Sequence, residues 1–218
     1  MSPFLAIDTS VGTSVALVAG GDVLAEVNFD DRMGHAENIG NALIEVFSKA
    51  GIAPARISAV VVGRGPAPFT GLRVGIAAAI AFAEGVAKPI FGVVSHDAIA
   101  LAAIRGGAKP SEGQPLLVTT DARRSEVYWS LYSCSDSHGV PLRVDGPHVA
   151  KPATLEELLA GREVLRTEAS VTAVDLAIVA ERQMLAGLLR TDLSALYLRD
   201  PDAVAPKPHV RLGKAVSE

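Results

Sequence analysis

The residues best placed to do chemistry are an acidic side chain and two hydroxyls after the first apolar segment, and a glycine-rich loop further along. Asp8, Thr9 and Ser10 follow FLAI, and the loop reads GRGPAPFTGLRVG from Gly63 to Gly75. Backbone N–H groups in such a loop, at the start of a helix, can hold an anion. The candidate ligands of a metal-bound nucleotide are therefore Asp8, Thr9, Ser10, Gly63, Arg64, Gly65, Thr70 and Asp121.

A purely structural turn explains the same residues. Pro66 and Pro68 remove two backbone donors, and the Lys-Ser/Thr ending of a phosphate-binding P-loop is missing. Aspartates at the junction of a strand and a turn are often simple turn formers. The residues alone leave both anion binding and a structural turn open.

The helix predicted from Thr70 onward carries almost no charge, since Arg73 is the only charged residue between Leu72 and Ala83. One stripe of small residues permits close helix approach, and a ridge of larger apolar residues lies beside it. The stripe is Gly71, Gly75, Ala79 and Ala83, and the ridge is Leu72, Ile76 and Ile80. Either the rest of the chain covers this helix or a second chain does, and we favour the second chain. Gly75→Leu is then expected to block the partner while the protomer stays folded.

Other catalytic patterns are missing from the sequence. The five histidines form no pair spaced i and i+4, so no metal site is expected, and no Gly-x-Ser-x-Gly motif indicates a nucleophile. Some basic residues are candidate phosphate contacts, although we favour solvated surface charge as their explanation. They are Arg123, Arg124, Lys207, Arg211 and Lys214.

Composition narrows the class of protein. The 218 residues are 49% hydrophobic and carry a formal net charge of -4, which argues against affinity based on a basic nucleic-acid-binding surface. The start, MSPFLAIDTS, does not resemble a signal peptide. The most apolar window, Val74 to Ala83, is shorter than the roughly 20 residues that span a bilayer. With Cys134 as the single cysteine, we expect a cytoplasmic protein without membrane association.

Hydrophobic periodicity predicts an α/β protein. Strands at 4–8, 13–19 and 23–29 form a meander, and a helix at 35–50 precedes a buried strand at 59–63. A strand at 90–94 and a helix at 96–104 follow, with Ser95 as the N-cap of that helix.

The second half repeats the plan of the first. LLVTTDARRSEVYWSLYS again ends an apolar strand in an aspartate, so that Asp121 matches Asp8, and a connector at 106–115 separates the halves. We therefore predict two related lobes, residues 1–105 and 106–218. A helix at 174–189 is predicted to place four residues in the core, Ile178, Met184, Leu185 and Leu188.

Four segments together resemble the TsaB (YeaZ) family of bacterial tRNA threonylcarbamoyladenosine biosynthesis proteins. They are LAIDTS, GRGPAPFTGLRVG, DARRSEVYWSLY and LYLR, and they occur in family order over nearly the whole chain. The resemblance implies a duplicated actin-like/ASKHA (ribonuclease H-like) fold, with two lobes of mixed sheets flanked by helices. Ala67 and Pro68 depart from the family's usual loop, which makes phosphate binding there less favourable.

The resemblance also implies a function and partners. It implies a non-catalytic subunit that binds the larger paralogue TsaD, together with the ATPase TsaE, for threonylcarbamoyl transfer to tRNA, and a homodimer when TsaD is absent. No cofactor is expected, unless ATP or ADP binds at the subunit interface; an ATP-dependent phosphotransferase of the same superfamily is the alternative function. The implied interface is His35, Asn38, Ile39, Ala42, Leu43, Gly71, Leu72, Arg73, Gly75, Ile76, Ala79, Ile80 and Ala83.

Overall fold

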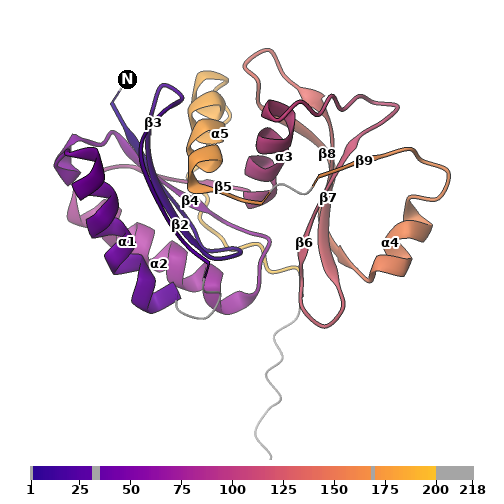
Figure 1. The fold of residues 1–218 in the computed structure, drawn as a ribbon, viewed down its shortest axis with the longest axis horizontal. Helices are drawn as coiled ribbons and strands as arrows, with labels where there is room; N and C mark the ends of the chain where they lie inside the picture. The colour runs from indigo at the N-terminus through magenta and orange to yellow at the C-terminus, as the bar shows by residue number, and fades with distance from the viewer. Residues whose placement is uncertain (1, 31–34, 168–169, 200–218) are drawn as a thin grey trace, which may run out of the picture.

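The first half of the chain folds around a five-stranded sheet. The structure is a computed structural model that describes residues 2–30, 35–167 and 170–199; of residue 35 it describes the backbone alone. The strand order is β3-β2-β1-β4-β5 (Figure 1). As predicted, the first three strands form an antiparallel meander, whereas β4 and β5 run parallel to β1. The bounds are β1 Phe4–Asp8, β2 Thr13–Ala19, β3 Asp22–Phe29, β4 Ala59–Gly63 and β5 Ile90–Val93.

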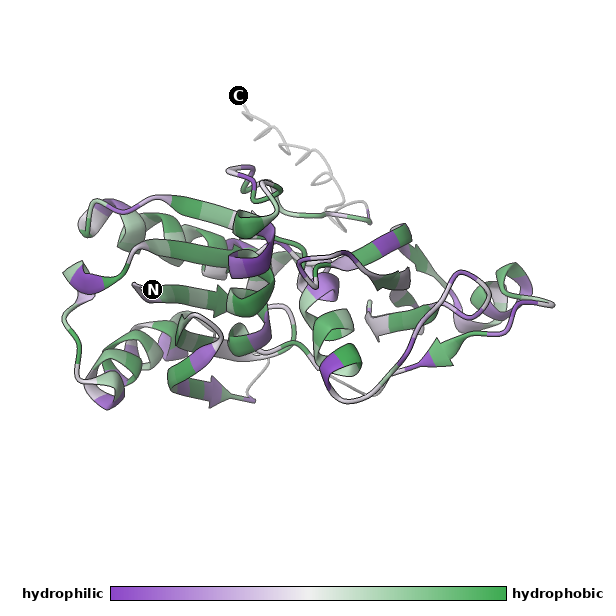
Figure 2. Cartoon of the chain, turned by 90° about the horizontal axis from the view of Figure 1, so that it is seen from above, coloured by the Kyte–Doolittle hydropathy of each residue, from purple (hydrophilic) through white to green (hydrophobic). Residues whose placement is uncertain are grey.

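Helices cover both faces of this sheet (Figure 1). On one face lie α1 (His35–Ala50) and α2 (Phe69–Gly85), and on the other lies α5 (Ala173–Leu185). The helix α3 (Ser95–Arg105) packs between α5 and the second sheet. Successive strand residues point to opposite faces, so a strand buried on both sides must be apolar at every position. Both faces of β1 and β4 are accordingly apolar, and Figure 2 shows the sheet as largely hydrophobic. A short 3-10 helix, Pro54–Arg56, precedes β4.

The second sheet repeats the pairing of the first. Its order is β8-β7-β6-β9, with β6 antiparallel to β7 and parallel to β9, which matches β3-β2-β1-β4. The helix α4 (Pro152–Leu158) packs on its outer face. This topology confirms the predicted duplicated α/β fold of two mixed sheets flanked by helices. The strands are β6 Leu116–Asp121, β7 Val127–Ser135, β8 Pro141–Ala150 and β9 Leu165–Arg166.

The helix α5 follows the second sheet in the chain but packs against β1 and β2 of the first. It ends at Leu185, four residues earlier than predicted, and Gly187 follows with a positive φ of 70°. Ile178 is buried as predicted. The prediction of a core position was wrong for Met184, Leu185 and Leu188, which are exposed. The division at residues 105 and 106 stays a prediction, and the packing of α5 does not follow it.

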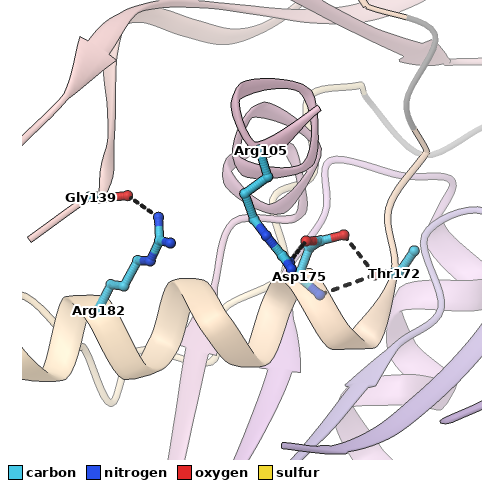
Figure 3. A network of polar contacts seen from close by, with 5 residues as sticks. All are labelled: Arg105, Gly139, Thr172, Asp175 and Arg182. Atoms are coloured by element: carbon cyan, nitrogen blue, oxygen red, sulfur yellow. Dashed lines mark hydrogen bonds and ion pairs between the residues drawn. The ribbon is translucent and has the colours of Figure 1, made fainter. Parts of the chain in front are cut away.

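Polar contacts fix α5 at both ends (Figure 3). Thr172 caps the helix by accepting a hydrogen bond from Asp175 N (3.0 Å), and Arg105 at the end of α3 forms a 2.8 Å ion pair with Asp175. Further along, Arg182 donates to the carbonyl of Gly139 (2.7 Å), between β7 and β8. The helix therefore joins the two halves of the molecule.

A strap of irregular backbone, residues 190–199, forms a second connection. The Arg64 guanidinium pairs with Asp192 (2.7 Å), and Arg199 donates to the carbonyl of Ala122 in the second half (2.8 Å). The LYLR segment lies in this strap and forms no regular helix or strand. The strap thus runs from the glycine-rich loop to the turn between β6 and β7.

Candidate functional site

The carboxylate of Asp8 lies buried at the end of β1. Its Oδ1 accepts hydrogen bonds from Ser10 N (2.7 Å) and Ser10 Oγ (2.6 Å), and its Oδ2 accepts one from Ser95 Oγ (2.6 Å). Only 1% of Asp8 is exposed, and a Cβ on Gly63 would collide with its Oδ2. The carboxylate is therefore engaged by the chain itself, and this close approach explains the glycine at position 63.

Ser95 connects this cluster to the glycine-rich loop. Its backbone N–H donates to the carbonyl of Gly65 (2.8 Å), and its hydroxyl accepts from Gly65 N (3.2 Å). The prediction of Ser95 as a helix N-cap was wrong, because Val94 occupies the cap and no side chain caps α3. The Ser95 hydroxyl instead donates a hydrogen bond to Asp8, 87 residues away in the sequence.

The small-residue stripe of α2 faces the protein's own interior. Thr9 Oγ1 donates a 2.8 Å hydrogen bond to the carbonyl of Gly71, and a Cβ on Gly75 would collide with the Thr9 side chain. Five residues predicted to meet a partner are buried in the protomer, namely Gly71, Leu72, Gly75, Ala79 and Ala83. The close approach that the stripe permits is to β1 and the turn after it, so assigning the stripe to a second chain was wrong.

The other candidate nucleotide ligands have surroundings of their own. Arg64 is bound by the strap, and Thr70 is exposed on the first turn of α2. Asp121 is exposed at the end of β6 and accepts from Arg123 N (2.8 Å), which makes it a turn former. A cavity of about 180 Å³ reaches Asp8, but among the described residues its lining does not include Asp121. Nucleotide binding by this set stays a prediction.

The exposed sides of α1 and α2 carry a group of apolar residues, which we call the outer helical face. The outer helical face consists of Gly40, Leu43, Ile44, Arg73, Ala77, Ile80 and Ala81. Ile44 is 74% exposed, Leu43 and Ile80 are half-buried, and Arg73 is the only charged member. Large contiguous apolar patches are typical of interaction sites, so this face is a candidate for one.

The predicted interface residues are divided between the outer and the inner sides of α1 and α2, and partner binding by them stays a prediction. Arg73 is exposed, and Asn38, Leu43, Ile76 and Ile80 are half-buried. Ile39 and Ala42 are buried on the inner side of α1. The side chain of His35 lies outside the described part of the chain. The outer helical face also contains Gly40, Ile44, Ala77 and Ala81, which the predicted interface did not include although their spacing of four was visible in the sequence. Because α2 is apolar all round, periodicity could not show which side faces the sheet.

A second polar cluster joins α3 to the second sheet. His96 is completely buried, with its ring nitrogens 2.9 Å from the hydroxyls of Ser130 and Thr120. Burial, with a smaller effect of the Arg143 charge, lowers the pKa of His96 to about 3. Perturbed pKa values often mark catalytic sites, but here both ring nitrogens have partners and no solvent access. This histidine is a structural contact between the two halves.

Asp97, next along α3, is buried in the same region. It accepts a 2.7 Å hydrogen bond from Tyr132 and lies 3.7 Å from the Arg143 guanidinium. Burial raises the pKa of Asp97 and of Tyr132. Neither group is placed for proton transfer to a ligand, since both are enclosed by protein.

Two remaining predictions concern charged and metal-binding groups. Arg123 and Arg124 are exposed on the turn after β6, so surface charge and phosphate contact both remain open for them. Lys207, Arg211 and Lys214 lie outside the described residues. Within the described ranges, no three His, Cys, Asp or Glu side chains gather as a metal site, and no helix is long and apolar enough to cross a membrane.

The sequence of this chain is similar to a family model and to several bacterial proteins. A family model described as TsaD, tRNA N6-adenosine threonylcarbamoyltransferase, matches residues 23–180. A Mycobacterium tuberculosis protein is 35% identical over 214 residues, which cover 93% of this chain and 94% of that protein. The tRNA threonylcarbamoyladenosine biosynthesis protein TsaB of Escherichia coli is 33% identical over 154 residues, 70% of this chain. The chain covers 64% of the length of that TsaB, and 41% of the length of a Mycobacterium leprae relative.

A solved structure has the same fold. It is a Pseudomonas aeruginosa protein described as similar to peptidase YeaZ, 25% identical, with a TM-score of 0.75. The match covers 91% of this chain and all of the other. Both halves of the molecule therefore have counterparts in that structure.

Proposed function

Because this chain belongs to the TsaB (YeaZ) family, within the wider family of the TsaD model, we propose that it acts in the biosynthesis of threonylcarbamoyladenosine in tRNA. Its role in this proposal is that of a non-catalytic subunit that binds and activates the transferase TsaD in the cytoplasm. The ATPase TsaE joins the complex, and tRNA meets this chain indirectly through that complex.

The outer helical face carries the proposal. Its α2 residues between Leu72 and Ala83 include one charge, Arg73, and Ile44 projects from α1 with 74% of its surface exposed. Protein interfaces are poor in charge at their centre and often include arginine. Helices α1 and α2 lie side by side on the outside of the first sheet, so a second pair of helices can pack against both (Figure 1). In the absence of TsaD, a second copy of this chain would cover the same face.

The buried polar residues support a non-catalytic role. Asp8, the best candidate for nucleotide chemistry, is 1% exposed and accepts hydrogen bonds from Ser10 and Ser95. To bind a metal-nucleotide, this carboxylate would have to give up the three hydrogen bonds that it accepts from Ser10 N, Ser10 Oγ and Ser95 Oγ. We therefore assign the chain no cofactor of its own. ATP-dependent phosphotransfer, and ATP or ADP bound between subunits, remain the alternatives.

Mixing the purified chain with its cognate TsaD tests the proposal directly. Light scattering after gel filtration should show one complex with the summed mass of the partners, and in vitro modification of tRNA by TsaD should depend on this chain. Two species that elute separately at micromolar concentrations, together with tRNA modification that proceeds equally well without this chain, would contradict both parts of the proposal.

A further inference from the structure

A cavity of about 490 Å³ lies in the second half of the molecule, beside the helix α4, at the opposite end from α1 and α2 (Figure 1). It lies between the strands β7 and β8 and the helix α4. Its apolar walls include Trp129, Leu131 and Leu159, all buried, and the 63% exposed Leu158. Cavities of roughly 300 to 1,000 Å³ with apolar walls are the usual sites of small-molecule binding.

Two lining residues, Arg162 and Trp129, carry a polar group without a partner within the described part of the chain. The guanidinium of Arg162 is exposed and makes no hydrogen bond or ion pair there. The indole Nε1 of Trp129 is buried without an acceptor, beneath the surface of the lining, and an unsatisfied buried donor is unfavourable. The lining thus offers a ligand one accessible cation, the guanidinium of Arg162, beside apolar walls.

The acidic group of the lining is already engaged. Asp145 Oδ1 accepts from Gly146 N (2.8 Å) and lies 2.8 Å from His148 Nε2. Within the described ranges it is the only carboxylate in the cavity lining, so the cavity has too few oxygen ligands for a divalent cation. The charge that lacks a counterpart is the positive charge of Arg162.

We propose that this cavity binds a small molecule with a compact apolar body and one carboxylate. The body packs against Trp129, Leu131 and Leu159 and covers Leu158, while the carboxylate pairs with Arg162. A single cation with apolar walls suits one carboxylate better than the several charges of a nucleotide phosphate chain. The Thr154 hydroxyl, also in the lining, is a second polar group available to the ligand.

Trp129 is the only tryptophan of the chain, so its fluorescence reports on this cavity alone. The probe is cyclohexanecarboxylate, which does not absorb where tryptophan does, and cyclohexanecarboxamide is its uncharged analogue. Titration with the carboxylate should change the Trp129 emission saturably, and the amide should bind roughly fivefold more weakly, about the value of one exposed ion pair.

Variants separate charge recognition from general apolar binding. Arg162→Gln should weaken carboxylate binding roughly fivefold and leave amide binding unchanged, whereas Arg56→Gln, at an exposed arginine of the first half, should change neither. Equilibrium dialysis gives the affinities independently of fluorescence, and thermal unfolding shows whether each variant folds. A non-saturable emission change, or carboxylate binding unaffected by Arg162→Gln, would overturn the proposal. Neither result depends on whether the chain binds TsaD.

Discussion

Thr9 occupies the space that any side chain on Gly75 would need, since a Cβ at Gly75 would lie well inside contact distance of Thr9 Oγ1. The earlier expectation that Gly75→Leu leaves the protomer folded is therefore wrong. Even Gly75→Ala should lower the free energy of unfolding by about 1–3 kcal/mol, as is usual when a tightly packed site is overfilled. Urea denaturation of the isolated protomer measures this loss.

Gly40 provides the matched control for that substitution. It also lies within a helix, on the exposed side of α1, and no atom lies within 4 Å of a Cβ placed there. Gly40→Ala should raise the free energy of unfolding by about 0.5–1 kcal/mol, because alanine favours the helix. If Gly75→Ala were as stable as the parent chain, the contact with Thr9 could not be as tight as described.

A charge at the centre of the outer helical face should prevent partner binding without unfolding the chain. Ile44 is 74% exposed, so Ile44→Asp changes little in the free protomer but would bury an unpaired carboxylate in the complex. Calorimetric titration should show affinity for TsaD reduced by roughly tenfold or more. Leu185→Asp on α5, at a residue 60% exposed, is the control and should bind normally. Equal affinities for the two variants would place the interface elsewhere.

Much of the fold could be predicted because local signals mark its elements. Alternating apolar residues and glycine turns located β1 and β2 at their observed bounds, and α1 coincides with the predicted helix at 35–50. The match of Asp8 with Asp121 was also correct, since each ends the first strand of its sheet. The two aspartates nevertheless differ, because Asp8 is buried and Asp121 is exposed.

The errors concern contacts between residues far apart in the sequence. The orientation of α2 depends on the hydrogen bond from Thr9 to Gly71, 62 positions away, which the uniform apolarity of the helix conceals. The position of α5 on the first sheet depends in part on Glu181, which accepts hydrogen bonds from Gly20 N (2.7 Å) and Gly21 N (2.8 Å). By contrast, the early end of α5 had a local signal in Gly187 that was overlooked.

The buried His96 should make stability depend on pH. The pKa of His96 is about 3 in the folded chain and 6.5 when the side chain is unperturbed, so between these values the unfolded chain binds more protons. Stability is therefore expected to fall as the pH decreases from 6.5 towards 3, with His96 contributing up to about 1.4 kcal/mol per pH unit. Above 6.5 this contribution is constant.

Urea denaturation from neutral pH down to about pH 5, where ordinary carboxylates stay charged, measures this dependence. His96→Gln should flatten the curve, and His138→Gln, at an exposed residue, should leave it unchanged. Burial raises the pKa of Asp97, which acts in the opposite direction, so the informative quantity is the difference in slope between variant and parent. Identical slopes would show that His96 does not carry the effect.

Asp8→Asn tests the structural role of the most buried candidate for nucleotide chemistry. The two carboxylate oxygens of Asp8 now accept hydrogen bonds from Ser10 and Ser95. An asparagine keeps one acceptor oxygen, but its NH2 group would face a hydrogen-bond donor in place of the other. Losing a charged acceptor should cost about 2–3 kcal/mol of unfolding free energy. Asp121→Asn, at the exposed counterpart in the second sheet, keeps an acceptor for Arg123 N and should change stability by less than about 0.5 kcal/mol.

Steady-state ATP hydrolysis should be undetectable in the parent and both variants. ATP turnover by the parent that disappears in a fully stable Asp8→Asn variant would instead show that this carboxylate takes part in nucleotide chemistry.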